Sequence, residues 1–234
     1  MLSIIFDIDD TLYHRQDPFC LAFQKQFPDF RNMDGSQLFR QFLKYGNALF
    51  EDSMAGRIPM DEMYIKRIQM ALADFHVSIT DREALDFQNA YLWEQEHIRL
   101  HPAYRQMLND CREHSVFLAI ITNGPSAHQR LKYTALGLDE WIPEDSVIAS
   151  GDIGINKPDT GIFLAAEKKW NLNPSRTLYV GDSYEHDILS AKSVGWNTLW
   201  LDRNRSSLKK NCSAADYVAF TEEELAECIR RILQ

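Results

Sequence analysis

The sequence lacks the features that would assign it to a membrane, to a disulfide-bonded fold or to a zinc site. No apolar run approaches the roughly 18 residues needed to cross a bilayer, and the apolar stretch of residues 1–6 is too short for a signal peptide. None of the cysteines, Cys20, Cys111, Cys212 and Cys228, forms a C-x-x-C pair. This scatter favours small buried thiols in a reducing cytosol, so we expect a cytoplasmic protein.

An excess of basic residues is also lacking. The chain has 25 Lys and Arg against 34 Asp and Glu, a net charge of -9, whereas nucleic-acid-binding domains usually carry a basic patch. Nucleic acid is therefore not an expected partner. A small anionic substrate stays possible, because screening at physiological salt acts over roughly 8 Å and local groups outweigh the total charge. With 45% hydrophobic residues, the 234-residue chain can hold one domain with a large insertion or two modest domains.

Short apolar segments recur along the sequence, four of them after residue 115. Near-continuous apolar runs of this length predict strands buried on both faces, as in a parallel sheet. The segments are Leu2–Phe6, Val116–Thr122, Ser146–Ala149, Thr177–Gly181 and Thr198–Asp202. Helical spacing lies between them at Ser126–Gly137 and Thr160–Asn171, and Thr221 with Glu224 fits a capping box at the start of a last helix. This alternation predicts an α/β fold with a doubly wound, Rossmann-like parallel sheet.

Residues 14–100 break the alternation and contain no convincing buried strand. Apolar residues recur there at helical spacing, namely Leu38, Phe39, Phe42, Leu43, Leu49 and Phe50, and then Met60, Tyr64, Ile68, Ala71, Leu72 and Phe75. Thr80 and Glu83 fit a capping box, which predicts another helix start. We therefore expect an α/β domain made of residues 1–13 and 101–234, with a helical domain of residues 14–100 inserted after the first strand.

Acidic residues follow the first predicted strand. Asp7 comes directly after it and Asp9 lies two residues on, so in a locally extended chain both side chains point the same way. Two crowded carboxylates repel unless a cation or a shared proton relieves them. Mg²⁺ is a suitable cation, because it takes oxygen ligands and is typically held by one or two carboxylates with substrate phosphate. Asp10 is interpreted as a turn residue that shapes the loop.

Polar groups also lie at the end of the second predicted strand. Thr122, Asn123 and Gly124 offer a hydroxyl and backbone N–H groups at the start of a helix, an arrangement that binds anions. Lys157 lies further on, just before another predicted helix. Each residue also has an ordinary interpretation, Thr122 as a turn residue and Lys157 as a surface lysine.

The strand predicted at Thr177–Gly181 adds two more carboxylates, because Asp182 follows it and Asp187 lies in the first turn of the next helix. The carboxyl ends of parallel strands meet at one edge of a sheet, where ligands bind. The four segments that begin at Asp7, Thr122, Lys157 and Asp182 each lie at a strand end or a helix start. Together they predict a divalent cation held beside a phosphoryl group.

These motifs resemble those of the haloacid dehalogenase (HAD) superfamily. They are Asp7-Ile8-Asp9-Asp10-Thr11, Thr122-Asn123-Gly124, Lys157-Pro158 and Gly181-Asp182-Ser183-Tyr184-Glu185-His186-Asp187. The resemblance covers the α/β part from end to end, and no motif departs from the family pattern. The helical insertion resembles the bundle cap of type I members. Leu12 and Tyr13, after the first motif, are similar to the capped nucleotidase-like phosphatases.

The resemblance implies a Mg²⁺-dependent phosphatase that works through an aspartyl-phosphate. Asp7 would attack phosphorus, and Asp9 would protonate the departing oxygen and then activate water. Mg²⁺ would be bound by Asp7, the backbone carbonyl of Asp9, and Asp182, with Asp187 in support. The phosphate-binding residues implied are Thr122, Asn123, Gly124 and Lys157.

Several alternatives remain beside hydrolysis of a phosphate monoester. Dehalogenases and phosphonate-cleaving members lack an aspartate at the position of Asp9, so this residue favours a phosphatase or a phosphomutase. A catalytically silent HAD-like binding module would be expected to have lost a key carboxylate. An ATP-binding loop before Lys157 is excluded, because the G-x-x-x-x-G-K spacing is absent.

The expected partner is a small phosphorylated metabolite, with no nucleic acid and no membrane, and the expected assembly is a monomer or homodimer. A nucleoside monophosphate is the leading candidate substrate and a small sugar phosphate the second. Substrate choice is expected to lie in the cap, which would close over the site as mobile lids do. Side chains that could contact a leaving group there are Tyr13, Tyr45, Phe50, Arg57, Tyr64 and Arg67, although aromatic residues at helical spacing more often face a core.

Overall fold

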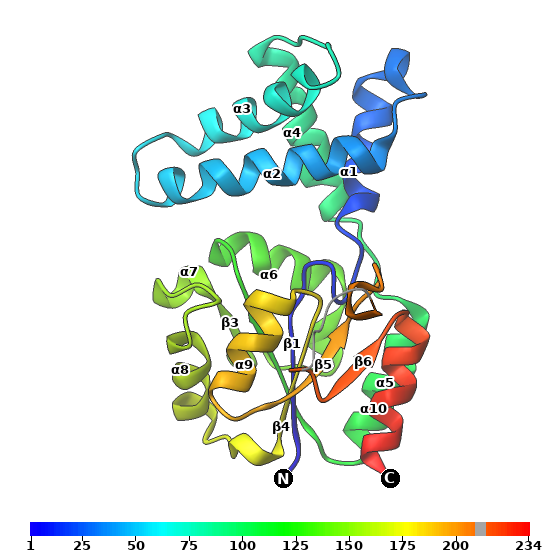
Figure 1. Ribbon diagram of the computed structural model, residues 1–234, viewed down its shortest axis with the longest axis vertical. Coiled ribbons are helices and arrows are strands. Elements are labelled where there is room, and N and C mark those ends of the chain that lie inside the picture. The colour runs from blue at the N-terminus through cyan, green and yellow to red at the C-terminus, as the bar shows by residue number, and fades with distance from the viewer. Residues whose placement is uncertain (209–213) are drawn as a thin grey trace. The chain divides into compact units, whose positions relative to one another are not determined.

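The computed structural model describes residues 1–208 and 214–234. It divides into two compact units, one of Met1–His14 with Ile98–Gln234 and one of Arg15–His97, both drawn in Figure 1. Buried hydrophobic clusters lie within each unit separately. Among the described residues, no helix is long and apolar enough to cross a membrane.

The first unit is built on a parallel sheet. In the part of the chain that the structure describes, this sheet has six strands in the order β3-β2-β1-β4-β5-β6, and every neighbouring pair is parallel. The strands are β1 (Ser3–Phe6), β2 (Phe117–Thr122), β3 (Val147–Ala149), β4 (Thr177–Gly181), β5 (Asn197–Leu201) and β6 (Tyr217–Ala219). This is the strand order of a doubly wound fold. Strands are added outward from β1 on one side and then outward from β4 on the other, so the β1–β4 boundary is the switch point of the topology. The prediction of a Rossmann-like α/β sheet is confirmed.

Helices cover both faces of this sheet (Figure 1). They are α5 (Pro102–Glu113), α6 (Ser126–Ala135), α7 (Ser150–Ile153), α8 (Gly161–Trp170), α9 (Ser190–Ser193) and α10 (Glu222–Leu233). Short 3₁₀ turns lie at Leu138–Glu140, Glu144–Ser146, Pro174–Arg176 and Ser206–Leu208, and a π-helical segment spans Tyr184–Leu189. Side chains of α5, α6 and α10 pack in one core cluster, and those of α8 and α9 pack in another.

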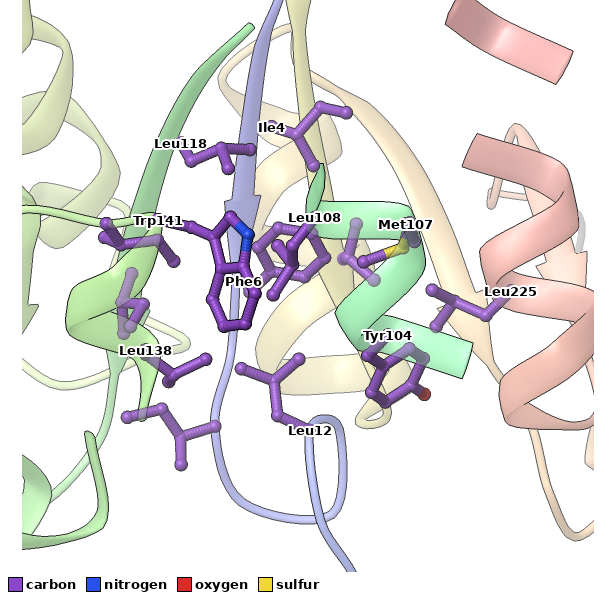
Figure 2. Close-up of a cluster of buried hydrophobic side chains, with 14 of the residues drawn as sticks. Ile4, Phe6, Leu12, Tyr104, Met107, Leu108, Leu118, Leu138, Trp141 and Leu225 are labelled. Carbon is purple, nitrogen blue, oxygen red and sulfur yellow. The ribbon is translucent and has the colours of Figure 1, made fainter. Parts of the chain in front are cut away.

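Strand β1 shows why these apolar runs form buried strands. Successive side chains of a strand point to opposite faces, so Ile4 and Phe6 join the cluster of α5 and α10 while Ile5 joins the cluster of α8. Figure 2 shows Phe6 and Leu108 among the side chains of the first of these clusters. Each such side chain, when fully buried, contributes about 1.5–3 kcal/mol. A run that is apolar at every position is therefore typical of a strand covered on both faces.

The sheet differs from the sequence prediction at its far edge. Strand β6 was not expected, because its three residues are too few to show a period and Tyr217 is exposed. Strand β5 ends at Leu201, and Asp202 instead accepts hydrogen bonds from the backbone N–H groups of Ser206 and Ser207, at 2.9 and 2.7 Å. Polar residues at a strand end are often used to close the following turn.

Helix caps in this unit partly follow the prediction. Gly137 has φ 64° after α6, as expected for a glycine at C′. At the start of α10, Thr221 Oγ1 accepts from the backbone N–H of Glu224 at 3.2 Å. Glu224 Oε2, however, accepts from the N–H of Phe220 at 2.7 Å. Thr221 is therefore an N-cap, but the reciprocal half of the box is made with the preceding residue.

The second unit consists of helices in the described residues. They are α1 (Gln16–Gln26), α2 (Gly35–Met54), α3 (Met60–Ala73) and α4 (Asp81–Gln95), with a 3₁₀ turn at Pro28–Phe30. Thr80 and Glu83 form the complete capping box that the sequence predicts. Helix α1 was not singled out from the sequence; it carries Pro18 in its first turn, where a missing N–H costs no intrahelical hydrogen bond.

Aromatic rings fill the core of this unit. Phe19 of α1 lies 4.8 Å from Phe42 of α2 and 5.4 Å from Phe87 of α4, measured between ring centroids. The second pair meets edge to face at 76°. Such pairs contribute roughly 0.5–1.5 kcal/mol beyond the burial of their area. Phe42 thus faces a core, as aromatic residues at helical spacing usually do.

The cysteines follow the expectation of unpaired thiols where they are described. Cys111 is buried, Cys20 and Cys228 are half-buried, and all three are free. Burial raises the pKa of the Cys111 thiol to about 12, so it stays protonated at neutral pH. Cys212 lies outside the described residues.

Candidate active site

Three neighbouring strands deliver polar residues to one edge of the sheet. Asp7 follows β1, Thr122 ends β2, and Asp182 follows β4, and β1 lies between the other two strands. The backbone N–H of Asp7 donates to the carbonyl of Val180 at 2.9 Å, which extends the ladder to the residue itself. This edge lies at the β1–β4 switch point, where doubly wound sheets bind ligands.

Three carboxylates converge there. Asp7, Asp182 and Asp187 each offer an oxygen, and these oxygens lie within 4.8 Å of one another. Asp187 is buried, and its Oδ2 accepts from the backbone N–H of Ser183 at 2.9 Å. A Cβ on Gly181 would overlap the Asp187 carboxylate, so the glycine before Asp182 is needed for this close approach.

Lys157 lies among these acids. Its Nζ donates to Asp7 Oδ1 at 2.8 Å and to Asp187 Oδ1 at 2.6 Å, and it contacts the Tyr179 hydroxyl oxygen at 2.8 Å. The Tyr179 hydroxyl donates in turn to the carbonyl of Ile121 at 2.7 Å. Three carboxylates and one ammonium leave two negative charges when all are ionised (3 − 1 = 2). A divalent cation would balance them, so these residues fit a bound Mg²⁺.

Crowding and burial shift the protonation of this group. Burial raises the pKa of Asp7 to about 6, with Lys157 opposing the rise and Asp187 adding to it. Burial, and then the charge of Asp187, raises the pKa of Asp182 well above its usual range. Burial disfavours the Lys157 ammonium, but Asp187 and Asp7 outweigh that effect and raise its pKa. Without a cation the site therefore resists full ionisation, which is the electrostatic behaviour of a metal-binding carboxylate cluster.

The side chain of Asp9 contacts a different set of residues. Its Oδ1 accepts from the Tyr13 hydroxyl at 2.5 Å, and both of its oxygens lie 2.7 Å from Lys132 Nζ. Gln129 Nε2 donates to Asp9 Oδ2 at 3.1 Å. The side chain of Asp9 is thus bound by donors of α6 and of its own loop, separately from the group that contains Asp7.

The residues expected to bind phosphate lie around the end of β2 and Lys157. The side chain of Asn123 accepts from the backbone N–H of Lys157 and donates to its carbonyl, both at 2.8 Å. The backbone N–H of Gly124 donates to Ser150 Oγ at 2.9 Å. Thr122 is buried, and its hydroxyl lies 3.5 Å from Gln129 Oε1. Asn123 therefore fixes Lys157, and a phosphate oxygen at Gly124 would compete with Ser150 for the same proton.

The loop after β1 is shaped as a turn at Asp10. This residue has φ 55°, a left-handed conformation that aspartate tolerates better than most residues. Arg203 donates to its carbonyl oxygen. Trp200 Nε1 donates to the carbonyl of Asp182 at 2.8 Å. Trp200 of β5 and Arg203 after it thus hold the backbone of the loops that follow β4 and β1.

The side chains considered for leaving-group contact occupy different environments. Tyr45 donates to Asp74, at 3.0 Å from each carboxylate oxygen, and the exposed Arg57 pairs with Asp52 at 2.7 Å. Phe50 and Tyr64 are half-buried. The Arg67 guanidinium stacks over the ring of Phe42 at 4.3 Å and over that of Tyr64 at 4.9 Å. Of the set, Tyr13 contacts Asp9.

Three residues of this site were not found from the sequence: Lys132, Gln129 and Tyr179. A signal for the first two was present. Gln129, Lys132, Tyr133 and Leu136 repeat at the spacing of one helical face, and all four are buried. A glutamine and a lysine at core positions of an amphipathic helix indicate a buried polar partner. Tyr179 offered no such signal, because a tyrosine is ordinary in a buried strand.

The doubly wound sheet carries a buried carboxylate cluster at the β1–β4 switch point. Comparison with known proteins identifies the family. The sequence signature described as haloacid dehalogenase-like hydrolase matches residues 1–195. The chain belongs to this family of hydrolases, which confirms the resemblance stated from the motifs.

Two curated relatives match over most of the chain, and a third matches over about half of it. A glyceraldehyde 3-phosphate phosphatase of Methanocaldococcus jannaschii is 22% identical over 230 residues, which cover 98% of this chain and 97% of the relative. The pyrimidine 5′-nucleotidase YjjG of Escherichia coli K12 is 29% identical over 201 residues, 85% of each chain. A phosphoserine phosphatase of Thermus thermophilus is 31% identical, but over 51% of this chain and 47% of its own length.

Solved structures share the fold. The HAD-hydrolase YfnB of Bacillus subtilis, whose crystal contained magnesium, superposes with a TM-score of 0.72 at 21% identity, covering 97% of this chain and 98% of its own. The L-2-haloacid dehalogenase of Xanthobacter autotrophicus gives a TM-score of 0.71 at 17% identity, with coverage of 98% and 99%. Because the same fold carries different reactions, these structural matches bear on architecture alone.

Proposed function

We propose that this chain is a Mg²⁺-dependent phosphatase that hydrolyses a small phosphate monoester through an aspartyl-phosphate on Asp7. One observation carries the proposal. Asp7 lies buried against Lys157 and beside two further carboxylates, while Asp9 is bound separately by Lys132. Two carboxylates close in sequence thus have different environments, which is the usual basis for different roles in one reaction.

In the first step, a carboxylate oxygen of Asp7 attacks phosphorus. The bond between phosphorus and the ester oxygen breaks as the acyl-phosphate bond forms, and Asp9 gives its proton to the departing alcohol. This step needs Asp7 ionised, and its contact with Lys157 Nζ at 2.8 Å favours that form against the effect of burial. Splitting a slow hydrolysis into two displacements lowers each barrier.

In the second step, water attacks phosphorus of the aspartyl-phosphate. Asp9, now ionised, takes a proton from the water, and Asp7 leaves as a carboxylate with release of inorganic phosphate. Asp9 is then protonated for the next cycle. A side chain that serves as acid and then as base must stay within hydrogen-bond reach of both the leaving oxygen and the water.

Asp7, Asp182 and Asp187 are the proposed side-chain ligands of Mg²⁺, together with the backbone carbonyl of Asp9. The bound ion would supply positive charge against the phosphoryl oxygens. Lys157 and Thr122, with backbone N–H groups near Asn123 and Gly124, are proposed to stabilise charge on the transferring group.

A nucleoside monophosphate is the proposed substrate, and a small sugar phosphate is the second candidate. The similarity to the nucleotidase YjjG supports the first, and the similarity to glyceraldehyde 3-phosphate phosphatases supports the second. The helical unit Arg15–His97 is proposed as the cap that selects between them. A cytoplasmic location is also proposed, since the described cysteines are unpaired.

The test uses purified protein with an aryl phosphate and Mg²⁺. We expect phosphate release that EDTA abolishes and that Asp7→Asn lowers by at least about 10³-fold, because the nucleophile is lost. Full activity of Asp7→Asn would show that the nucleophile is misassigned. A parallel panel of nucleoside monophosphates and sugar phosphates identifies the substrate class, and isomerised product without free phosphate would indicate a phosphomutase instead.

A further inference from the structure

Lys132 is a buried lysine in the last turn of helix α6. Its side chain is 3% exposed, although lysine is among the residues least often buried unless its charge is paired. Its Nζ lies 2.7 Å from each oxygen of Asp9. The two residues are 123 positions apart, so the contact depends entirely on how α6 packs against the loop after β1.

Two other donors also contact the Asp9 carboxylate. Gln129, one turn before Lys132 on α6, donates from Nε2 to Asp9 Oδ2 at 3.1 Å and to the carbonyl of Asn123 at 2.9 Å. The second contact fixes which way the Gln129 amide points. The Tyr13 hydroxyl donates to Asp9 Oδ1 at 2.5 Å. Each oxygen of Asp9 therefore accepts from two donors that approach from different directions.

This arrangement restricts the rotation of the Asp9 side chain. The terminal torsion of an aspartate has a broad energy well, so by itself it fixes the carboxylate plane poorly. Lys132 lies 2.7 Å from both oxygens, and Tyr13 and Gln129 each hold one. Lys157, by contrast, contacts Asp7 and Asp187 and serves the other carboxylate group. The site thus uses one buried lysine for the nucleophile and a different one for its neighbour.

We propose that Lys132 is the positioning residue for Asp9, holding the carboxylate where it can reach the ester oxygen and later the water. The inference rests on the proposed function, since that function gives Asp9 its acid–base role. Lys132 acts through Asp9 rather than on the phosphate. Its importance should therefore depend on how much a given substrate needs a proton on its leaving group.

That dependence follows from the chemistry of the leaving oxygen. An alkoxide leaves poorly and requires protonation, whereas dinitrophenolate is stable enough to leave as an anion. General acid catalysis typically contributes about 10²–10⁴-fold, and a misplacement of about 1 Å can cost about 10²-fold. A misplaced Asp9 should therefore slow cleavage of an alkyl phosphate far more than that of 2,4-dinitrophenyl phosphate.

The test compares Lys132→Met with the wild type on these two classes of substrate in the full chain with Mg²⁺. We expect kcat/KM for an alkyl phosphate to fall about 100-fold and kcat/KM for 2,4-dinitrophenyl phosphate to fall less than about 10-fold. Lys192→Met is the matched control. Lys192 also contacts both oxygens of an aspartate, Asp216, at 2.9 and 3.0 Å, but in a partly exposed pair, so its loss should change neither value.

A double-mutant cycle separates positioning from a general loss of structure. In an Asp9→Asn background, Lys132→Met should no longer affect the two substrates differently, because the residue that it positions is gone. If Lys132→Met does not fold, Tyr13→Phe removes one donor to the same carboxylate and should show the same selectivity at smaller size. An equal loss on both substrates, or the same selectivity in Asp9→Asn, would overturn the inference. A wild type inactive on every phosphate ester would instead refute the proposed function.

Discussion

Asp7 illustrates how the site and the stability of the fold oppose each other at the level of a single residue. Burial raises its pKa from 3.8 to about 6, while Lys157 opposes the rise. The folded protein therefore binds this proton more tightly than the unfolded chain does. Ionising Asp7 costs folding free energy between pH 4 and about 6, and the full cost is present above pH 6. The proposed nucleophile is held in its ionised form at the expense of stability.

Asp7→Asn should consequently stabilise the protein at high pH. A pKa difference of this size corresponds to about 3 kcal/mol, so we expect the free energy of unfolding in EDTA at pH 8 to rise by ~1–3 kcal/mol. The gain should shrink as the pH falls toward 4, where the carboxyl is protonated in both states. Chemical denaturation at several pH values measures it.

Asp216→Asn is the control for that prediction. Lys192 and the backbone N–H of Thr198 hold Asp216, and together with its other partners they lower its pKa despite the opposing effect of burial. Its removal should destabilise the protein at pH 8, the opposite sign. A destabilised Asp7→Asn at pH 8 would mean that the pair with Lys157 outweighs the cost of burial.

At the scale of an element, α4 is determined by local sequence, whereas the inward-facing polar residues of α6 depend on tertiary contacts. Helix α4 begins where its own residues dictate, because the Thr80 hydroxyl accepts from the N–H of Glu83 and the Glu83 carboxylate accepts from the N–H of Thr80. Helix α6 instead buries the side chains of Gln129 and Lys132. Their burial is favourable only because both donate hydrogen bonds to Asp9. The first pattern is readable from a few residues; the second needs the folded partner.

Thr80→Ala should destabilise the helical unit by about 1 kcal/mol, because a helix N-terminal N–H loses its acceptor. Thermal unfolding followed by circular dichroism, together with hydrogen exchange of the amides of α4, measures the loss. Ser78→Ala, an exposed position just before the helix, is the control and should leave both unchanged. Equal effects of the two changes would show that the cap does not determine where α4 begins.

At the scale of the whole molecule, the two units carry separate hydrophobic cores. Phe87 belongs to the cluster of the Arg15–His97 unit, and Phe163 belongs to a cluster of the other unit. Both side chains are fully buried. Separate cores predict that damage to one unit is felt first within that unit.

Phe87→Ala and Phe163→Ala form a matched pair, and each should cost about 3–5 kcal/mol of local stability through the cavity left behind. Hydrogen exchange resolved by peptide should show faster exchange in residues 15–97 for Phe87→Ala, and in the α/β unit for Phe163→Ala. Faster exchange across both units in either variant would mean that the chain unfolds as one cooperative body.

Much of the fold could be predicted from the sequence because buried parallel strands leave a strong pattern. Ile4–Phe6 and Leu178–Val180 are runs of consecutive buried apolar residues, which is typical of strands covered on both faces. Strand β6 left no comparable pattern, since its three residues lie at an exposed edge of the sheet. The roles of the two units as catalytic core and cap stay predictions.

The sequence by itself determined which groups converge: Asp7 and Asp182 follow parallel strands, Thr122 ends another, and the carboxyl ends of neighbouring parallel strands meet at one edge. Only the tertiary structure decided which carboxylate pairs with Lys157 and which with Lys132. Lys157 binds Asp7 and Asp187, whereas Lys132 binds Asp9. Sequence spacing does not predict these pairings. The partner of a lysine on a helix is set by the loop against which the helix packs, and that packing is a property of the tertiary structure.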